Sequence, residues 1–226
     1  MTTVRSVADE CNFRPKTLGD FIGLTEVKKT LGLMLSSARK RRSVLEHVVF
    51  FGPPGLGKTT LAAIIAAEMN GRLFELNASS VKKAGDLASV LAKVRRKDVV
   101  LLDDIHALPR DVAEIQYSAM EDFDLNIVVS DGRPPVRLTM PPFTLVGATT
   151  DFGLLPEPMR AHFGQSFHLQ LYTLEELRLV ISRAADKLGF MYDDVAFDGI
   201  AKRSRGTPRV ALCLFRRCVD LATNAS

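Results

Sequence analysis

A glycine-rich stretch at residues 52–59 carries the clearest chemical signal in the sequence. It reads Gly-Pro-Pro-Gly-Leu-Gly-Lys-Thr and lies between an apolar run at 48–51 and an apolar helical pattern at 60–69. In such a loop, backbone N–H groups hold phosphate oxygens, the lysine reaches the β and γ phosphates, and the threonine hydroxyl can ligate Mg²⁺. The alternative is a glycine-rich turn without a ligand. The flanking strand and helix favour a nucleotide site, which uses Gly55, Gly57, Lys58 and Thr59.

Two acidic residues, Asp103 and Asp104, end a second apolar run at 99–102. One carboxylate in this position can hold a hydrated Mg²⁺, and the other can polarise the water that attacks the γ phosphate. We therefore assign Asp103 to the metal, together with Thr59, and Asp104 to the water. Acidic residues at a strand exit can also cap the following helix, so capping is the alternative interpretation.

Short apolar runs that alternate with helical patterns must position these residues. The runs lie at 48–51, 73–76, 99–102, 143–146 and 167–171. Helices between most of them predict an α/β fold, with a parallel five-stranded sheet covered on both faces. Such a sheet binds its ligand at the carboxyl ends of its strands. Thr150, which follows the fourth run, thereby becomes a candidate catalytic residue.

The strand pattern stops after Leu171. Thr173 and Glu176 have the spacing of a capping box, and apolar residues recur at helical spacing beyond them. Two more helices are expected, at about 195–203 and after Pro208. We predict a nucleotide-binding domain over residues 1–172 and a small all-helical domain over residues 173–226.

Residues 126–140 interrupt the α/β pattern. Asp131-Gly132 is a hairpin turn signal between two alternating segments, so an inserted β-hairpin is expected. Its apolar side chains could bind a partner or pack on their own domain, and the sequence leaves both open. They are Ile127, Val129, Val136 and Leu138.

The composition is that of a globular protein. The chain has 226 residues, 46% of them hydrophobic and 25% charged, which excludes disordered and collagen-like classes. Its formal net charge of +4 permits a polyanion partner without requiring one. Three cysteines without zinc-type spacing support neither a disulfide framework nor a metal knuckle. With no secretory pattern and no long apolar run, we expect a soluble, cytoplasmic protein without membrane contact.

Taken in order, these residues resemble the RuvB family of AAA+ ATPases, the bacterial motors of Holliday-junction branch migration. The resemblance runs from about residue 13 to residue 222, nearly the whole chain. The segments that carry it lie at 14–18, 21–23, 51–60, 83–87, 119–123, 141–145, 147–150 and 205–209. Met-Glu-Asp-Phe at 120–123 and Pro-Pro-Phe-Thr-Leu at 141–145 are far more specific than any phosphate loop.

The resemblance implies a homo-oligomeric ring that binds ATP or ADP with Mg²⁺ between its subunits and acts on Holliday-junction DNA. It implies that the hairpin at 126–140 docks on a RuvA-like junction-binding partner. In the family a winged-helix domain follows, and we do not expect one within a chain that stops at residue 226. The resemblance also implies further nucleotide-site residues. Phe13 and Arg14 match the adenine-contacting segment, and Thr60 matches the phosphate loop. Glu121, Asp122 and Phe123 match the subunit interface, and Tyr172 and Arg209 match the lid.

Two positions depart from the family pattern at catalytic residues. The family has Asp-Glu-Ile-His where this chain has Asp-Asp-Ile-His, so the carboxylate of Asp104 is one methylene short. The family's trans-acting finger, the second arginine of Pro-Leu-Arg-x-Arg-Phe-Gly, is His162 here, and Arg160 is the candidate substitute. A cationic finger is worth about 10³ to 10⁵ in turnover, so a mostly neutral imidazole predicts weakened hydrolysis.

The departures leave three interpretations open. The first is a RuvB-like motor with weakened hydrolysis. The second is a nucleotide-binding scaffold that docks on a RuvA-like partner and scarcely hydrolyses ATP. The third, a clamp-loader-type subunit, does not explain the hairpin together with Met-Glu-Asp-Phe.

Overall fold

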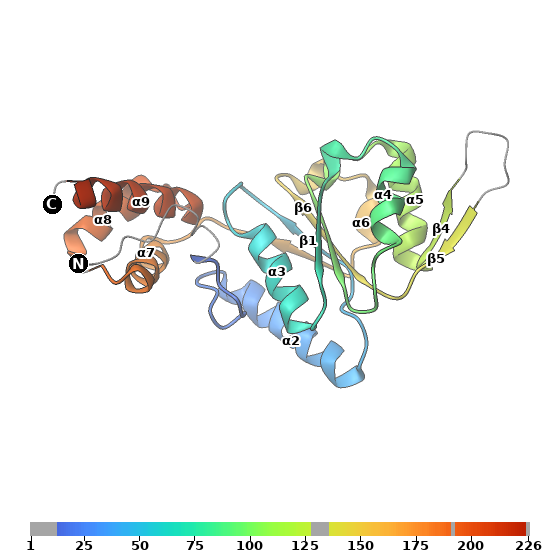
Figure 1. Cartoon of the computed structure of the whole chain (residues 1–226), viewed down its shortest axis with the longest axis horizontal. Coiled ribbons are helices and arrows are strands. Elements are labelled where there is room, and N and C mark those ends of the chain that lie inside the picture. Colours follow the sequence, from blue (N-terminus) through green and yellow to red (C-terminus); the bar gives the residue numbers. More distant parts are fainter. Residues whose placement is uncertain (1–12, 128–135, 191–192, 225–226) are drawn as a thin grey trace.

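A computed structural model describes residues 13–127, 136–190 and 193–224 of the chain. Figure 1 shows two groups of elements along its longest axis: a sheet with its covering helices, and three helices beside it. Among the described residues, no helix combines the length and the apolar character needed to cross a membrane.

The sheet has five parallel strands, as the sequence predicts. Their order is β2-β3-β6-β1-β7. The strands are β1 (Val48–Phe51), β2 (Leu73–Asn77), β3 (Val99–Asp103), β6 (Thr144–Thr149) and β7 (Gln165–His168). The first strand in the chain, β1, is therefore second from one edge, between β6 and β7. The loop that follows β1 thus leaves the sheet from an interior strand rather than from an edge strand.

The fifth strand is displaced from its expected position. The sequence predicts it at 167–171, whereas β7 covers Gln165–His168. Gln165 and Ser166 pair with Val48 and Val49 of β1 although both are polar, because β7 is the edge strand and has one partner. The fourth strand also extends further than expected, to Thr149. Apolar runs locate the strands, but they miss polar residues at an edge.

Alternating side chains of the strands pack on two separate cores. Val48 and Phe50 of β1 join the cluster that contains α2 (Thr25–Arg41) and α3 (Lys58–Glu68). Val49 joins the cluster that contains α4 (Ala84–Leu91), α5 (Arg110–Glu121) and α6 (Glu157–Ala161). Helices therefore cover both faces, as expected for a parallel sheet.

The inserted hairpin is present as a separate two-stranded sheet. Strand β4 (Asp124–Ile127) pairs antiparallel with β5 (Val136–Thr139), and the pair extends away from the main sheet beyond α5 (Figure 1). At its base, Arg137 Nε donates a hydrogen bond of 3.0 Å to Asp124 Oδ2. The expected turn at 131–132 and Val129 lie outside the described residues. The roles of the hairpin's apolar side chains therefore stay predictions.

Three helices follow the last strand. They are α7 (Leu174–Leu188), α8 (Asp194–Arg203) and α9 (Pro208–Asn224). The capping box is confirmed: Thr173 N–H donates to Glu176 Oε2 at 2.8 Å, and Glu176 N–H donates to Thr173 Oγ1 at 3.2 Å. Phe197 of α8 and Phe215 of α9 pack edge to face with ring centroids 6.2 Å apart. Their cluster also contains side chains of α2 and α3, so the three helices share a core with one side of the sheet domain.

Candidate nucleotide site

The glycine-rich loop connects β1 to α3, as the sequence predicts. The helix begins at Lys58 rather than at Thr60, which places Lys58, Thr59 and Thr60 all in its first turn. Gly57 precedes it in the left-handed region, with φ of +99°. A Cβ at Gly57 would lie 3.0 Å from the ring of Phe21, so this position requires both the conformation and the small size of glycine. The N–H groups in the first turn of α3 can donate hydrogen bonds to an anion beside Lys58.

The ammonium group of Lys58 is held against the loop. Its Nζ donates to the carbonyl oxygens of Gly52 and Pro53, at 2.7 and 3.0 Å. Burial lowers the pKa of Lys58, and the nearby carboxylates of Asp103 and Asp104 oppose that shift. The structure thus brings the predicted phosphate-binding cation and the two predicted acids into one electrostatic environment.

Asp103 and Asp104 lie at the carboxyl end of β3. Asp104 has a left-handed backbone, with φ of +52°, and its N–H donates to Asp103 Oδ1 at 3.2 Å. It occupies the position before the short 3₁₀ helix Ile105–Ala107, yet its side chain makes no capping hydrogen bond. The capping interpretation is therefore wrong for Asp104, and its carboxylate is left available for a ligand.

The end of β6 carries a contact that the sequence analysis missed. Thr149 is fully buried, and its Oγ1 lies 2.9 Å from Nδ1 of His106. The same hydroxyl donates to the carbonyl of Asp151 and accepts from its N–H, so the remaining lone pair accepts from Nδ1–H of His106. Thr150, the predicted residue, is exposed directly after the strand. The His106–Thr149 bond ties the exit of β3 to that of β6.

The first turn of α9 packs directly on the phosphate loop. The N–H of Arg209 lies 3.4 Å from the carbonyl oxygen of Gly55. A Cβ at Gly55 would come within 2.7 Å of Thr207 Cγ2 and 3.0 Å of Arg209 Cβ. The backbone of Arg209, the predicted lid arginine, therefore contacts the phosphate loop directly.

The other predicted lid and adenine-side residues differ in exposure. Tyr172 is buried, and burial together with the carboxylate of Glu176 raises its pKa. Its ring lies against Gly23, where a Cβ would be 2.7 Å away. Phe13 packs on the same core, whereas Arg14 is exposed. Tyr172 is therefore packed between the sheet domain and α7.

His162 lies at the opposite end of the sheet from the phosphate loop. It follows α6, and Gly164 N–H donates to the carbonyl of His47, immediately before β1, at 2.9 Å. The phosphate loop leaves the other end of β1, a strand of four residues or about 13 Å. His162 therefore cannot serve the phosphate loop of its own chain without a large rearrangement.

Glu121, Asp122 and Phe123 gather with His162 rather than with Lys58. They form the carboxyl end of α5 and the turn into β4, and Glu121 contacts His162. The resemblance places these residues at the subunit interface, so their assignment to a nucleotide site stays a prediction. In the family pattern the nucleotide site lies between two subunits. The sequence alone therefore does not say whether residues 121–123 face the site of their own chain or that of a neighbouring subunit.

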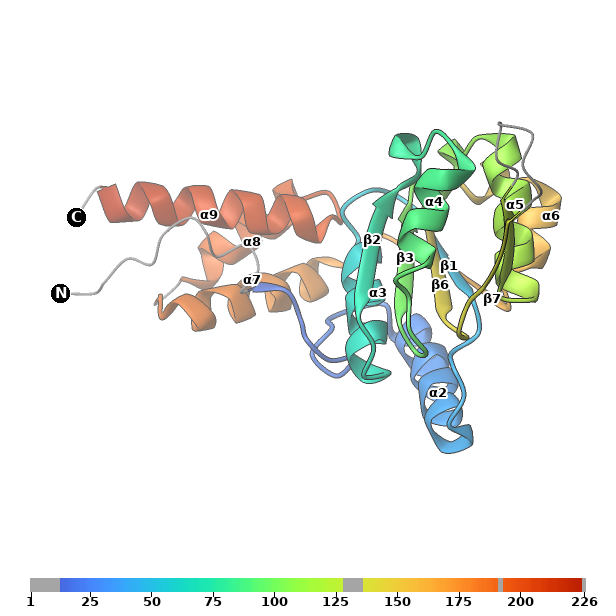
Figure 2. The same ribbon diagram turned by 45° about the vertical axis from the view of Figure 1, so that its right-hand side comes forward.

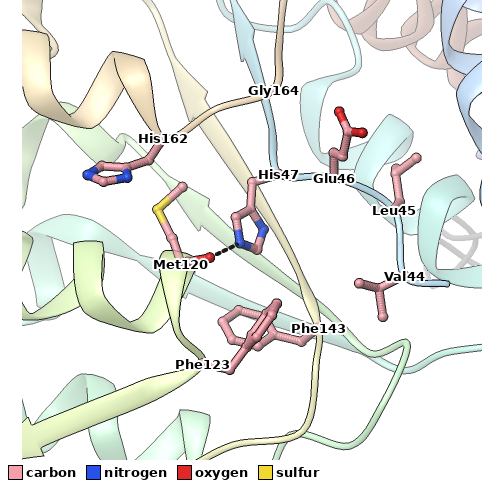
Figure 3. A pocket seen from close by; sticks show the side chains of 9 residues that line it. All are labelled: Val44, Leu45, Glu46, His47, Met120, Phe123, Phe143, His162 and Gly164. Atoms are coloured by element: carbon pink, nitrogen blue, oxygen red, sulfur yellow. Dashed lines mark hydrogen bonds between the residues drawn. The ribbon is translucent and has the colours of Figure 1, made fainter.

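A pocket of about 320 Å³ opens beside His162 (Figure 3). It was not predicted. His47 lies at its centre: its Nδ1 accepts from Leu145 N–H at 2.9 Å, so its Nε2 carries the proton and donates to the carbonyl of Met120 at 3.0 Å. Burial lowers the pKa of His47, the Met120 carbonyl opposes that shift, and the neighbouring His162 adds to it. His47 thereby joins β1, β6 and α5 as a neutral side chain.

A parallel sheet whose first strand leads into a phosphate-binding loop, with a helical lid resting on that loop, defines a nucleotide-binding P-loop domain of the AAA+ class. The family model described as the Holliday junction DNA helicase RuvB P-loop domain matches residues 13–169, and the model described as the RuvB AAA lid domain matches residues 172–226. The chain belongs to the RuvB family, which confirms the resemblance of its sequence motifs.

Individual relatives agree with the family models. The chain is 46% identical over 219 residues to the Holliday junction branch migration complex subunit RuvB of Sulfurimonas denitrificans, covering 96% of this chain and 65% of the relative. It is 50% identical over 216 residues to the protein of that name from Anaplasma phagocytophilum, covering 94% of this chain and 66% of the relative. The chain thus spans about 65% of the curated relatives that it matches.

Solved structures support the same fold. The Thermotoga maritima RuvB Holliday junction branch migration motor matches with a TM-score of 0.85 and 46% sequence identity. The match covers 94% of this chain and 67% of that one. A mutant of the Thermotoga protein matches with a TM-score of 0.87 at 45% identity, covering 94% of this chain and 68% of that one.

Proposed function

We propose that this chain binds ATP with Mg²⁺ and hydrolyses it between the subunits of a homo-oligomeric ring. In this proposal, hydrolysis drives Holliday-junction branch migration in DNA recombination and repair. The observation that carries the proposal is the convergence of Lys58, Asp103 and Asp104 at a phosphate loop on which Arg209 rests. The names of the relatives support the motor rather than the scaffold.

The oxygen donors beside the loop fit Mg²⁺. Thr59 supplies a hydroxyl and Asp103 a carboxylate, and Mg²⁺ prefers a few such oxygens completed by water and substrate phosphates. No cluster of three or more His, Cys, Asp or Glu side chains among the described residues forms a metal cage of its own. Thr59 and Asp103 would hold the ion, which would supply positive charge to neutralise the negative charge that develops on the phosphates.

The remaining roles fall to residues around the loop. Lys58, already partly stripped of water, exchanges its two loop carbonyls for phosphate oxygens. Asp104 orients the attacking water, and Thr150 senses the γ phosphate from the end of β6. Arg209 follows the phosphate charge with a bidentate fork and moves the lid when that charge is lost. Phe13, Arg14 and Tyr172 enclose the adenine side.

A neighbouring subunit completes the site. The edge formed by His162 and residues 121–123 faces away from its own phosphate loop, so in a ring it meets the loop of the next copy. His162 or Arg160 then supplies positive charge to the phosphates of the neighbour. We also propose that residues 1–172 and 173–226 move as two domains, with the lid following the nucleotide.

The hairpin at 126–140 is the proposed docking element for a RuvA-like partner. It extends from the sheet domain on the side away from the lid (Figure 1). Val129→Glu combined with Leu138→Lys should abolish partner pull-down and leave nucleotide affinity unchanged. Loss of nucleotide binding in this variant would instead assign those side chains to the core of the domain.

Junction dissociation tests the proposed function as a whole. With a RuvA-like partner and ATP, a fluorescently labelled Holliday junction should separate into duplexes, and a non-hydrolysable ATP analogue should block the reaction. A protein that binds ATP and the partner but leaves the junction intact would be the scaffold of the second interpretation, and the motor proposal would fail.

A further inference from the structure

Two basic segments, far apart in the sequence, meet on the surface of the sheet domain. Helix α2 ends in Arg39, Lys40 and Arg41 and is followed by Arg42, while residues 93–97 read Lys-Val-Arg-Arg-Lys. The two segments touch because Arg96 NH2 donates to the carbonyl oxygen of Arg42 at 3.1 Å. We call the exposed cations of both segments the basic edge: Lys40, Arg41, Arg42, Lys93, Arg95 and Arg96.

The basic edge lies away from the nucleotide site. Residues 93–97 lead directly into β3, and the segment after Arg42 leads into β1, so both sit at the amino ends of the strands. Figure 2 shows the carboxyl end of α2 projecting past the sheet there. The phosphate loop and Lys58 lie at the carboxyl ends. The basic edge is therefore not part of the ATP site, and its charge needs another explanation.

Acidic side chains near the basic edge are already engaged elsewhere. Glu68 pairs with Arg39 at 2.5 Å, and the buried Asp98 pairs with Arg72 at 2.6 Å. Hydrogen bonds from Arg72 and from the N–H of Arg95 outweigh the effect of burial and lower the pKa of Asp98, which keeps it ionised. Within the described part of the chain, no ion pair involves the six cations of the basic edge. They form an uncompensated positive surface on a chain whose formal net charge is +4.

The chemistry of the basic edge fits phosphate better than a protein surface. Four of the six cations are arginines, whose planar forks match phosphate oxygens in pairs. Protein interfaces instead centre on apolar and aromatic side chains and are depleted in lysine. None of the large apolar side chains exposed on the described residues falls within 39–42 or 93–97. We infer that the basic edge binds the sugar-phosphate backbone of nucleic acid, without reading its bases.

The position of the basic edge links this contact to the hairpin. Lys97 N–H donates to the carbonyl of Pro142 at 3.2 Å, and Pro142 follows shortly after β5. The segment at 93–97 therefore contacts the chain shortly after the hairpin. The inference rests on this surface alone, and it holds whether or not the nucleotide site hydrolyses ATP.

Salt-dependent binding of a labelled DNA duplex tests the inference. The double variant Arg41→Gln with Arg95→Gln removes two charges from the basic edge. The matched control, Arg110→Gln with Lys202→Gln, removes two exposed charges from α5 and α8. Fluorescence anisotropy between about 50 and 200 mM salt gives the slope of log affinity against log salt, which changes by about 0.9 for each phosphate contact. ATP affinity of each variant, measured in parallel, reports that the fold is intact.

The expected result is a slope lower in magnitude by about 2 for the Arg41 and Arg95 variant, with weaker binding to every duplex sequence. The control variant should keep the wild-type slope, and both should keep wild-type ATP affinity. Equal losses in the two variants would show that net charge alone attracts DNA and would overturn the inference. Binding of an acidic polypeptide, polyglutamate, more tightly than DNA through Arg41 and Arg95 would also overturn it.

Discussion

The imidazole Nδ1 of His162 lies 3.2 Å from the carboxylate Oε1 of Glu121, and the imidazole ring stacks on Tyr117 with centroids 4.9 Å apart. Only 16% of the His162 side chain is exposed. The residue in the finger position is thus held by α5 of its own chain. Arg160, two residues earlier, is directed elsewhere: its guanidinium carbon lies 5.7 Å from the ring centroid of Phe152.

These contacts predict that His162→Arg raises ATP turnover. A permanent cation stabilises the negative charge that develops on the γ phosphate, and a full finger contributes about 10³ to 10⁵. We expect at least a tenfold increase in steady-state turnover. Asp104→Glu should add a further gain, though not additively, because both side chains act on one transition state.

Alanine variants distinguish the two finger candidates. Mixed rings combine wild-type subunits with subunits whose own site is disabled by Lys58→Ala. When the disabled subunits also carry His162→Ala, the turnover of their wild-type neighbours should fall. If only Arg160→Ala abolishes hydrolysis, and His162→Arg changes nothing, then Arg160 is the finger and the assignment of His162 is wrong.

Lys58→Ala should weaken ATP affinity by about 10- to 100-fold, the effect of losing charge-assisted hydrogen bonds to phosphate. Isothermal titration with ATP and Mg²⁺ measures this directly. Lys202→Ala, which removes an exposed lysine of α8, serves as the control and should bind as the wild type does. Equal affinity of Lys58→Ala and wild type would refute the phosphate-loop assignment.

Gly55→Ala should displace the lid. The new methyl group would meet Thr207 and Arg209 at 2.7 and 3.0 Å, and the backbone at Gly55 has a φ of +82° that alanine adopts poorly. We expect weaker ATP binding and a lower unfolding temperature. Gly85→Ala is the matched control, because nothing lies within 4 Å of a Cβ there. Wild-type affinity and stability of Gly55→Ala would show that the lid does not rest on the loop.

The neutral state of His47 predicts a loss of stability in mild acid. Its pKa in the fold is below the ordinary value of 6.5, so the unfolded chain takes up a proton that the folded chain resists. The free energy of unfolding should therefore fall as the pH drops from about 7.5 to about 5.5. His47→Gln retains a donor and an acceptor without titrating, and urea unfolding of this variant should show a smaller fall. Identical pH profiles would exclude His47 as the cause.

Local sequence patterns predicted the parts of the site that one segment or one strand end supplies. Lys58 and Thr59 follow from the phosphate-loop pattern, and Asp103 and Asp104 follow from an apolar strand with two acids at its end. The five-stranded sheet was predictable for the same reason, because buried parallel strands are short, continuous apolar runs. The polar start of β7, at Gln165, breaks that pattern.

Features that join distant segments were not predictable from the same patterns. The His106–Thr149 hydrogen bond depends on β3 and β6 being neighbours although 40 residues lie between the two strands in the sequence. The cluster of Glu121 with His162, and the contact of Arg96 with Arg42, depend in the same way on tertiary packing. Periodicity assigns a residue to an element and a face, but it does not say which element lies opposite.

ATP turnover per chain, measured against protein concentration, tests the central claim that the hydrolytic site lies between subunits. The account predicts a turnover that rises with concentration and reaches a plateau as rings form, because in the proposed function either His162 or Arg160 acts on the nucleotide of a neighbour. Light scattering on the same samples reports assembly. A turnover per chain that stays constant from isolated chains to full assembly would show that one chain holds a complete site, and would contradict the account.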